Sequence, residues 1–326
     1  MASIALPFSE TRARPVAIAN WLLAVAALVF LIVVVGGITR LTESGLSMVR
    51  WEPVSGIVPP LSDADWAAEF AAYRASPQYA QVNAGMSLAA FKGIYFWEYV
   101  HRVLARLFGV AVLLPWLWFA AKRAIPAGYG WRIGGILVLG ALQPVVGWWM
   151  VASGLVDRPS VAHERLAVHL CLALTIMGAC IWTALDLRDG RGRVARWVVP
   201  FLALLSVQIV WGAFTAGLRA GHAADTWPLM LGSLVPPLAS LIDDPVSVQW
   251  VHRSLAWFVA GAALWIAVRE GGRRGALLGG LVVLQFILGV ITVIGGVPLA
   301  VAAAHQAGAA ALLAATLWLA HRKAGA

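Results

Sequence analysis

Charged residues are scarce in this sequence. Only 12% of its 326 residues are Asp, Glu, Lys or Arg, whereas 61% are hydrophobic. Because a soluble domain carries about 25% charged residues, this composition excludes an ordinary water-soluble domain and indicates a polytopic membrane protein. The basic residues also lie in short loops between apolar segments rather than on one face, so nucleic-acid binding is a poor interpretation.

Cysteine is scarcer still. Cys171 and Cys180 are the only two, and both fall within one apolar segment. On one helix they would stand roughly 13 Å apart along the axis, at about 1.5 Å per residue, which is too far for a disulfide. The sequence therefore implies no disulfide framework, and both thiols are predicted to be small buried core residues.

A cleavable signal is also missing. Residues 1–20 contain Arg12 and Arg14 before a long apolar run, without a small-residue cleavage site. We expect a retained first span rather than a removed signal peptide. The segment is too short and too weakly basic to be a persuasive organelle transit peptide, which favours a bacterial protein in the inner (plasma) membrane.

Long apolar segments are what the sequence does contain. A bilayer core about 30 Å thick is crossed by a helix of roughly 20 residues. The sequence therefore predicts an all-α polytopic membrane protein whose eight transmembrane helices lie near 16–38, 94–120, 132–152, 165–185, 197–218, 250–268, 276–296 and 299–320.

The placement of charge predicts the orientation. If the N-terminus is inside, the inner loops carry most of the Lys and Arg, including the run from Arg188 to Arg196, and the outer loops carry most of the acids. The positive-inside rule then makes both termini cytoplasmic. Two long outer loops, residues 40–92 and 219–249, occupy equivalent places in the two halves. Residues 66–73 of the first loop show a short amphipathic pattern, predicted to be a helix on the membrane surface.

An internal repeat divides the chain. Gly36-Gly37-Ile38-Thr39 in the first span matches Gly212-Ala213-Phe214-Thr215 in the fifth, and Gln143 with Gly147 matches Gln285 with Gly289. A repeat of four spans keeps both halves in one orientation. We expect two pseudo-symmetric four-helix bundles, residues 1–190 and residues 191–326.

Every even-numbered span contains one histidine near its outer end, and no odd-numbered span has one: His101, His169, His252 and His305. An imidazole inside a membrane is costly unless something binds it. Two imidazoles facing each other across a four-helix bundle form a bis-histidine haem site, so the repeat predicts one pair per half. Zinc needs about four ligands per site, and a proton relay needs ionisable groups across the whole bilayer; neither half supplies them.

Arginines accompany these histidines at the outer ends of the spans. Haem propionates need cationic partners, and arginine binds carboxylates through two parallel hydrogen bonds. We expect propionate contacts from Arg102, Arg40 and Arg165 in the first half and from Arg253 and Arg219 in the second. The remaining histidines are predicted to lie away from the sites: His163 exposed, His222 in the outer loop and His321 in the cytoplasmic tail.

Glu98 distinguishes the two halves. It lies three residues before His101 on the same helix face, whereas the equivalent residue before His252 is the neutral Gln249. A carboxylate beside a cofactor can act as a base or stabilise a developing cation. An outer-face acid paired with a nearby arginine is the structural alternative. The difference from Gln249 predicts that only the first half performs chemistry.

These motifs together resemble the haem A synthase family, in the branch found in alphaproteobacteria and mitochondria. The resemblance covers nearly the whole chain and is strongest at Thr42-Glu43-Ser44-Gly45-Leu46-Ser47-Met48, Glu98-Tyr99-Val100-His101-Arg102, Arg165-Leu166-Ala167-Val168-His169, Val251-His252-Arg253 and His305-Gln306. His163-Glu164 departs from the family's pattern.

The resemblance implies conversion of haem O to haem A for cytochrome oxidase. It implies a permanent haem b on the iron ligands His252 and His305, the substrate haem facing His101 and His169, and Glu98 essential for turnover. In this view the C8 methyl is oxidised twice and the geminal diol loses water to give the formyl group. Membrane lipid, haem O synthase, cytochrome oxidase assembly factors and a second copy of the chain are the candidate partners. A dihaem electron-transfer cytochrome and a haem carrier or assembly chaperone stay open as other functions.

Overall fold

Eight long helices dominate the part of the chain that the structure, a computed structural model, describes: residues 13–50, 55–156 and 158–323. Each is long and apolar enough to cross a membrane. They are α1 (Pro15–Leu41), α4 (Leu88–Ala121), α5 (Gly130–Ala152), α6 (His163–Asp189), α7 (Val199–Gly217), α8 (Pro245–Glu270), α9 (Gly272–Ile294) and α10 (Leu299–Ala320).

The predicted spans are therefore confirmed, with small shifts at their ends. Proline opens α1, α7 and α8, where its missing N–H removes no helical hydrogen bond. The largest shift is at α4, which begins six residues before the predicted 94. There the Ser87 side chain accepts a hydrogen bond from the Ala90 amide and caps the helix.

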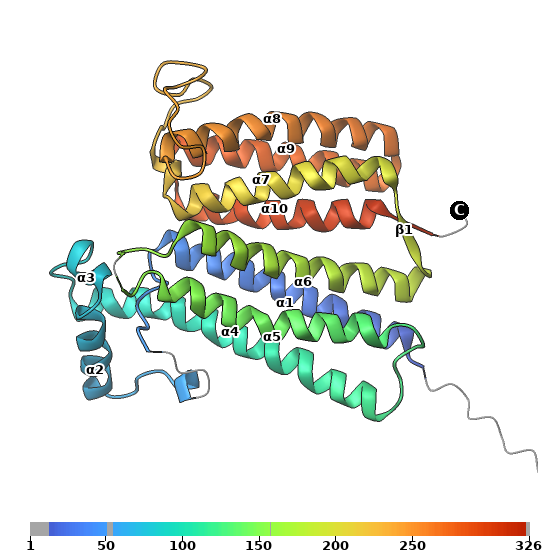
Figure 1. Cartoon of the computed structure of the whole chain (residues 1–326), viewed down its shortest axis with the longest axis horizontal. Coiled ribbons are helices and arrows are strands. Elements are labelled where there is room, and N and C mark those ends of the chain that lie inside the picture. Colours follow the sequence, from blue (N-terminus) through green and yellow to red (C-terminus); the bar gives the residue numbers. More distant parts are fainter. Residues whose placement is uncertain (1–12, 51–54, 157, 324–326) are drawn as a thin grey trace, which may run out of the picture.

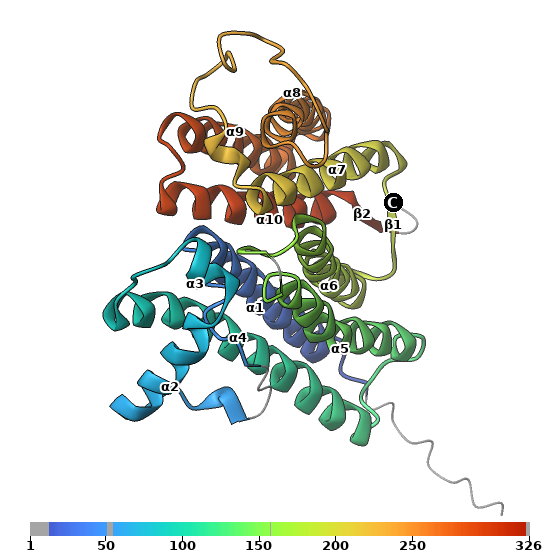
Figure 2. The same cartoon turned by 60° about the vertical axis from the view of Figure 1, so that its left-hand side comes forward.

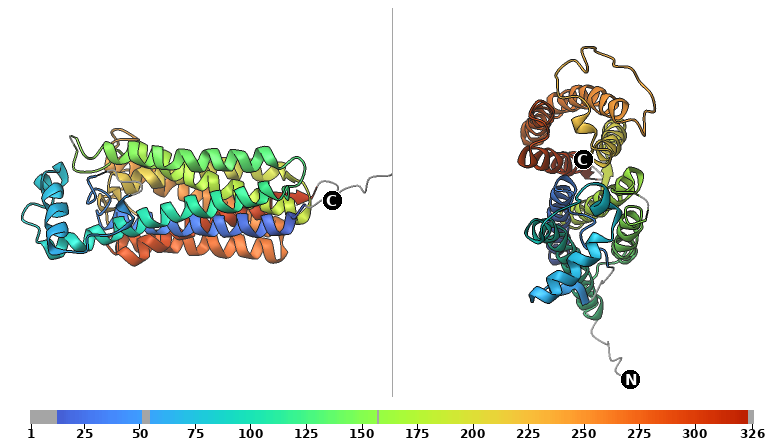
Figure 3. Two further views of the ribbon diagram at one scale, coloured as in Figure 1. Left: turned by 90° about the horizontal axis from the view of Figure 1, so that it is seen from below. Right: turned by 90° about the vertical axis from the view of Figure 1, so that its left-hand side faces the viewer.

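The helices form two groups of four (Figures 1 and 3), with α1, α4, α5 and α6 in one and α7 to α10 in the other. One buried cluster fills the first group, including Leu22, Phe108 and Met177. A second fills the other group, including Phe201 and Leu278. The groups meet where α6 packs on α7 and α1 packs on α10.

The outward surfaces of these helices are apolar. Leu114, Val138, Phe258 and Val268 each expose more than half of their surface. A soluble monomer rarely exposes apolar patches on this scale, whereas a bilayer requires them. Inward burial and outward apolar exposure together fit a multi-pass membrane protein.

Both long loops lie at one end of the helices (Figure 1). The first contains η1 (Ser55–Ile57), α2 (Asp63–Arg74) and α3 (Pro77–Gln81), and α2 runs across the direction of the spans (Figure 2). The helix predicted at 66–73 is confirmed, and its contact with a membrane surface stays a prediction. The side chains of Ser62 and Asp65 form a capping box at its start.

A two-stranded sheet that the sequence did not predict lies at the opposite end. Strand β1 (Gly192–Val194), which links the halves, pairs antiparallel with β2 (His321–Lys323) at the C-terminus. Short 3-10 turns, η2 (Arg196–Val198) and η3 (Ala220–His222), flank α7.

Candidate functional site

Each of the four predicted histidine ligands packs against a glycine on a neighbouring helix. The glycines lie in α1, α5, α7 and α9, and the histidines in α4, α6, α8 and α10. A Cβ atom on the glycine would stand 2.9–3.1 Å from the histidine Cε1 in the pairs Gly36–His101, Gly147–His169, Gly212–His252 and Gly289–His305. Glycine therefore provides the space that each ring occupies, and the same construction occurs four times.

A backbone carbonyl lies beside three of the four rings. Nδ1 of His305 lies 3.1 Å from the Gln285 carbonyl, one turn before its glycine, and the rings of His101 and His252 contact the backbone of Ile32 and Gln208 in the same way. A metal-bound histidine usually donates the N–H of one ring nitrogen to such an acceptor and binds the metal through the other nitrogen. The contact at Nδ1 therefore leaves Nε2 as the nitrogen that can bind a metal.

The second pair has a geometry that suits one iron. The rings of His252 and His305 lie 6.3 Å apart between centroids, with an interplanar angle of 87°. Metal–imidazole bonds are about 2 Å long, so two nitrogens on one metal stand about 4 Å apart and the ring centres one ring radius further on each side. In the first half, His101 and His169 take the equivalent places against Gly36 and Gly147. The donor set of each half therefore fits a bis-histidine haem.

Glu98 is buried and held by three donors. Its side chain is 4% exposed. Oε2 accepts hydrogen bonds from the Ser47 hydroxyl at 2.7 Å and the Met48 amide at 2.8 Å, and Oε1 accepts one from Arg102 Nη2 at 2.6 Å. Ser47 and Met48 lie just after α1, so the first outer loop fixes this carboxylate on α4.

Comparison with known proteins identifies the family. Residues 19–317 match the model of the COX15-CtaA family, described as cytochrome oxidase assembly protein. The chain belongs to that family. A protein named Heme A synthase from Rhizorhabdus wittichii is 53% identical over 94% of this chain and 94% of its own length. Proteins of the same name are 46% identical in Sphingopyxis alaskensis, over 96% of this chain and 94% of their own, and 45% identical in Nitrosospira multiformis, over 94% and 93%.

Arg102 and Arg253, two of the predicted propionate partners, donate hydrogen bonds to backbone carbonyls. Arg102 donates to the carbonyls of Met48, at 2.8 Å, and Arg50, at 3.1 Å, besides pairing with Glu98. Arg253 donates to the carbonyls of Ala224, at 2.8 Å, and Thr226, at 2.9 Å. Each arginine thus clamps two carbonyls, two residues apart, in the outer loop of its own half.

In the second half, the side-chain amide of Gln249 takes the place of the Glu98 carboxylate and donates hydrogen bonds. Gln249 Nε2 donates to the carbonyls of Gly221, at 3.2 Å, and Ala224, at 2.9 Å. Glu98 accepts three hydrogen bonds at the equivalent place. The outer loop of the first half therefore donates hydrogen bonds to Glu98, whereas the outer loop of the second half accepts hydrogen bonds from Gln249. The predicted difference between Glu98 and Gln249 therefore extends to the loop around each residue.

The other three predicted arginines are engaged at the outer helix ends. Arg165 donates to the Trp149 carbonyl at 2.8 Å and stacks over its ring. Arg40 donates to the Gly217 carbonyl at 2.8 Å, and Arg219 pairs with Glu43 at 2.5 Å. Propionate binding by the five arginines stays a prediction. What sequence reasoning missed is that all five already bond within the chain.

Two histidines lie in surroundings that the sequence did not predict. His163, expected to be exposed, is only 7% exposed at the start of α6. His321, predicted to lie in the cytoplasmic tail, is 3% exposed and its Nε2 lies 2.8 Å from Asp186 Oδ1. The predicted exposure of His163 was wrong, because the residues that bury it are distant in the sequence and come together only in the fold.

Proposed function

We propose that this chain is a haem A synthase, an oxidoreductase that converts haem O to haem A for cytochrome oxidase. One observation carries the proposal: both halves build the same histidine–glycine pocket, and only the first places a buried carboxylate, Glu98, one turn before its histidine. The relatives named Heme A synthase, matched over more than nine-tenths of this chain, support the same function.

The two halves then have different haems. His252 and His305 bind a permanent haem b, which supplies a one-electron redox centre when bound. His101 and His169 bind haem O as substrate. Its C8 methyl is hydroxylated twice, each time losing two electrons to an oxidant from outside the chain, and the geminal diol loses water to give the formyl group. The haem sites lie towards the periplasmic face of a bacterial inner membrane, and both termini are cytoplasmic.

The contacts of Glu98 define which of its atoms can act. A carboxylate has about four acceptor positions, and three are used. Both positions on Oε2 are filled by Ser47 and Met48, and one on Oε1 is filled by Arg102. The remaining position on Oε1 is the one left to accept a substrate proton or to stabilise positive charge on the carbon being oxidised.

The test is Glu98→Gln, in a host that makes haem O but lacks its own enzyme for haem A. Glutamine keeps the size of the side chain but removes its charge, so we expect haem O or hydroxylated haem to accumulate in extracted pigments. Glu270→Gln is the matched control, because Glu270 is also a partly buried acid paired with an arginine, Arg322, at the other helix ends.

Normal haem A yield from Glu98→Gln would contradict the role of Glu98. Absence of haem A with the unaltered chain, when the protein is present and haem b is bound, would contradict the proposed function. Two tightly held haem b groups in the purified protein would instead identify a dihaem cytochrome.

A further inference from the structure

His163 lies outside the two haem pockets, where the halves meet. It is the first residue of α6 and packs against α7, with its Cα 2.8 Å from the place where a Cβ on Gly217 would stand. Its ring meets Phe214 edge-on, with centroids 5.2 Å apart. The side chain is 8% exposed, and Nε2 is a buried nitrogen without a hydrogen-bond partner among the described residues. An unpaired buried nitrogen is costly, so it requires a reason.

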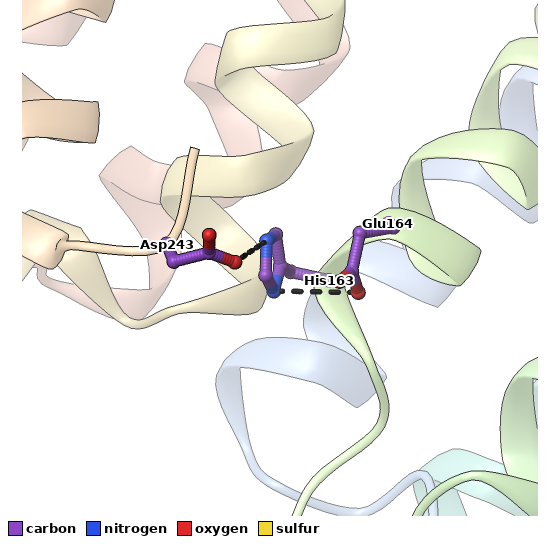
Figure 4. Close-up of side chains that lie close together, drawn as sticks. All are labelled: His163, Glu164 and Asp243. Atoms are coloured by element: carbon purple, nitrogen blue, oxygen red, sulfur yellow. Dashed lines mark ion pairs between the residues drawn. The ribbon is translucent and has the colours of Figure 1, made fainter. Parts of the chain in front are cut away.

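Two carboxylates approach this imidazole, one at each nitrogen (Figure 4). Glu164 Oε2 lies 3.5 Å from Nδ1, and Asp243 Oδ1 lies 3.6 Å from Nε2. Asp243 belongs to the outer loop of the second half, where the Ser240 hydroxyl donates to its other oxygen at 3.0 Å. One ligand atom from each of the three residues fits within 4.8 Å of the others.

These separations suit a metal ion better than a direct hydrogen bond. An Nε2 to Oδ1 distance of 3.6 Å exceeds hydrogen-bond length. Two bonds of about 2.0–2.2 Å to one zinc ion, from a nitrogen and a carboxylate oxygen, bridge such a gap. A carboxylate at the other ring nitrogen is the usual arrangement around a metal-bound histidine, because it orients the ring. Glu164 occupies that position.

We propose that His163 and Asp243 bind a divalent zinc-type cation, with Glu164 as a third ligand or as the group that orients the imidazole, and with water at the remaining positions. The ion would join α6 of the first half to the outer loop of the second. His163 also lines an open cleft with Arg158 and Arg219, which gives the ion a path from solvent, and Glu43 balances the charge of Arg219. The site is separate from the haem pockets and does not depend on the proposed function.

The experiment measures zinc in the full-length protein. The protein is purified in detergent with its haem, treated with a chelator, incubated with Zn²⁺ and desalted, and zinc and protein are then quantified. We expect the unaltered chain and His222→Ala to retain one more zinc ion than His163→Ala and Asp243→Asn. His222 is the matched control because it is an exposed histidine in the same outer loop.

Asp243→Asn keeps the test valid if His163→Ala fails to fold, because the Asp243 side chain is 61% exposed. Glu164→Gln should weaken zinc binding about 10–100-fold, the usual effect of removing a group that orients a ligand. Zinc should also raise the unfolding temperature of the unaltered chain and not that of His163→Ala.

Equal zinc content in the unaltered chain, His163→Ala and Asp243→Asn would overturn the site. So would an unaltered chain that retains no zinc after incubation and desalting.

Discussion

The pairing of the histidines is the residue-scale feature on which the haem assignment depends. Sequence alone placed His101, His169, His252 and His305 at similar depths in alternate spans. The structure adds that the rings of the second pair stand 6.3 Å apart. That separation depends on how the helices are rotated about their axes, which hydrophobic periodicity in these nearly all-apolar segments does not specify.

The two pairs should respond differently to removal of one ring. His305→Ala should release the permanent haem, so that the purified protein loses most of its bound haem b. His169→Ala should keep haem b and lose haem A formation. The haem-to-protein ratio and the extracted pigments measure the two effects, with His222→Ala as control. Equal loss of haem b from both variants would contradict different roles for the two halves.

The arginines show where residue-level prediction ends. The positions of Arg40, Arg165 and Arg219 at helix ends were correctly predicted. Arg102 and Arg253, which follow their histidines inside α4 and α8, bind loop carbonyls that the sequence did not indicate. Carbonyl acceptors occur at every residue, so a sequence pattern contains no sign of which arginine will find one. The pairing of Glu98 with Arg102, by contrast, follows from a spacing of four residues on one helix.

At the scale of elements, four pairs of neighbouring helices pack a glycine of one helix against a histidine of the other. The spacing of Gln143 with Gly147 and of Gln285 with Gly289 indicated a repeat, and glycine in a membrane helix permits close approach by a neighbouring helix. The structure shows that the approaching group is an imidazole in each case. Sequence could not assign each glycine to its histidine, because the assignment depends on which helices are neighbours and how far one is displaced along the other.

This match predicts the effect of one methyl group. In Gly289→Ala the new Cβ would stand 2.9 Å from His305 Cε1, so the ring must move and the bound haem b should fall several-fold. Gly280→Ala in the same helix is the control, because nothing lies within 4 Å of its Cβ. The control should be neutral or stabilise the helix by up to about 1 kcal/mol. Haem content at equal protein concentration measures both, and a similar decrease in both variants would contradict the packing role of Gly289.

At the scale of the whole molecule, polar contacts join the two halves at three heights along the helices. At the outer end Glu43 pairs with Arg219, and both adopt left-handed backbone conformations just after α1 and α7, with φ of 57° and 52°. Midway, Gln306 Nε2 donates to the Val33 carbonyl at 2.6 Å. The sequence predicted two groups of four helices. The predicted boundary between the two domains, after residue 190, stays a prediction. The sequence did not reveal these contacts between the halves, because each of the three includes a pair of residues more than a hundred positions apart.

The third set of contacts lies at the opposite end of the helices and centres on Asp186. This carboxylate, 1% exposed, accepts hydrogen bonds from Arg132 and, at 2.7 Å, from the Gly192 amide, and lies 2.8 Å from His321. It thereby joins α5, α6, the linker strand β1 and the C-terminal strand β2. Such a buried charge is tolerated only because it is paired on several sides.

Asp186→Asn tests whether this network holds the C-terminal strand in place. Asparagine keeps the shape but leaves the Arg132 charge uncompensated, and breaking a buried pair in this way costs roughly 3–5 kcal/mol. We expect a lower thermal unfolding midpoint and faster trypsin cleavage at Arg322, with Asp189→Asn, an exposed acid at the end of the same helix, as control. Haem b should stay bound below the new midpoint, because the proposed haem ligands His252 and His305 lie towards the other ends of α8 and α10. An unchanged midpoint with an uncut tail would mean that apolar packing of α10 against α6 and α9 suffices to hold the C-terminus.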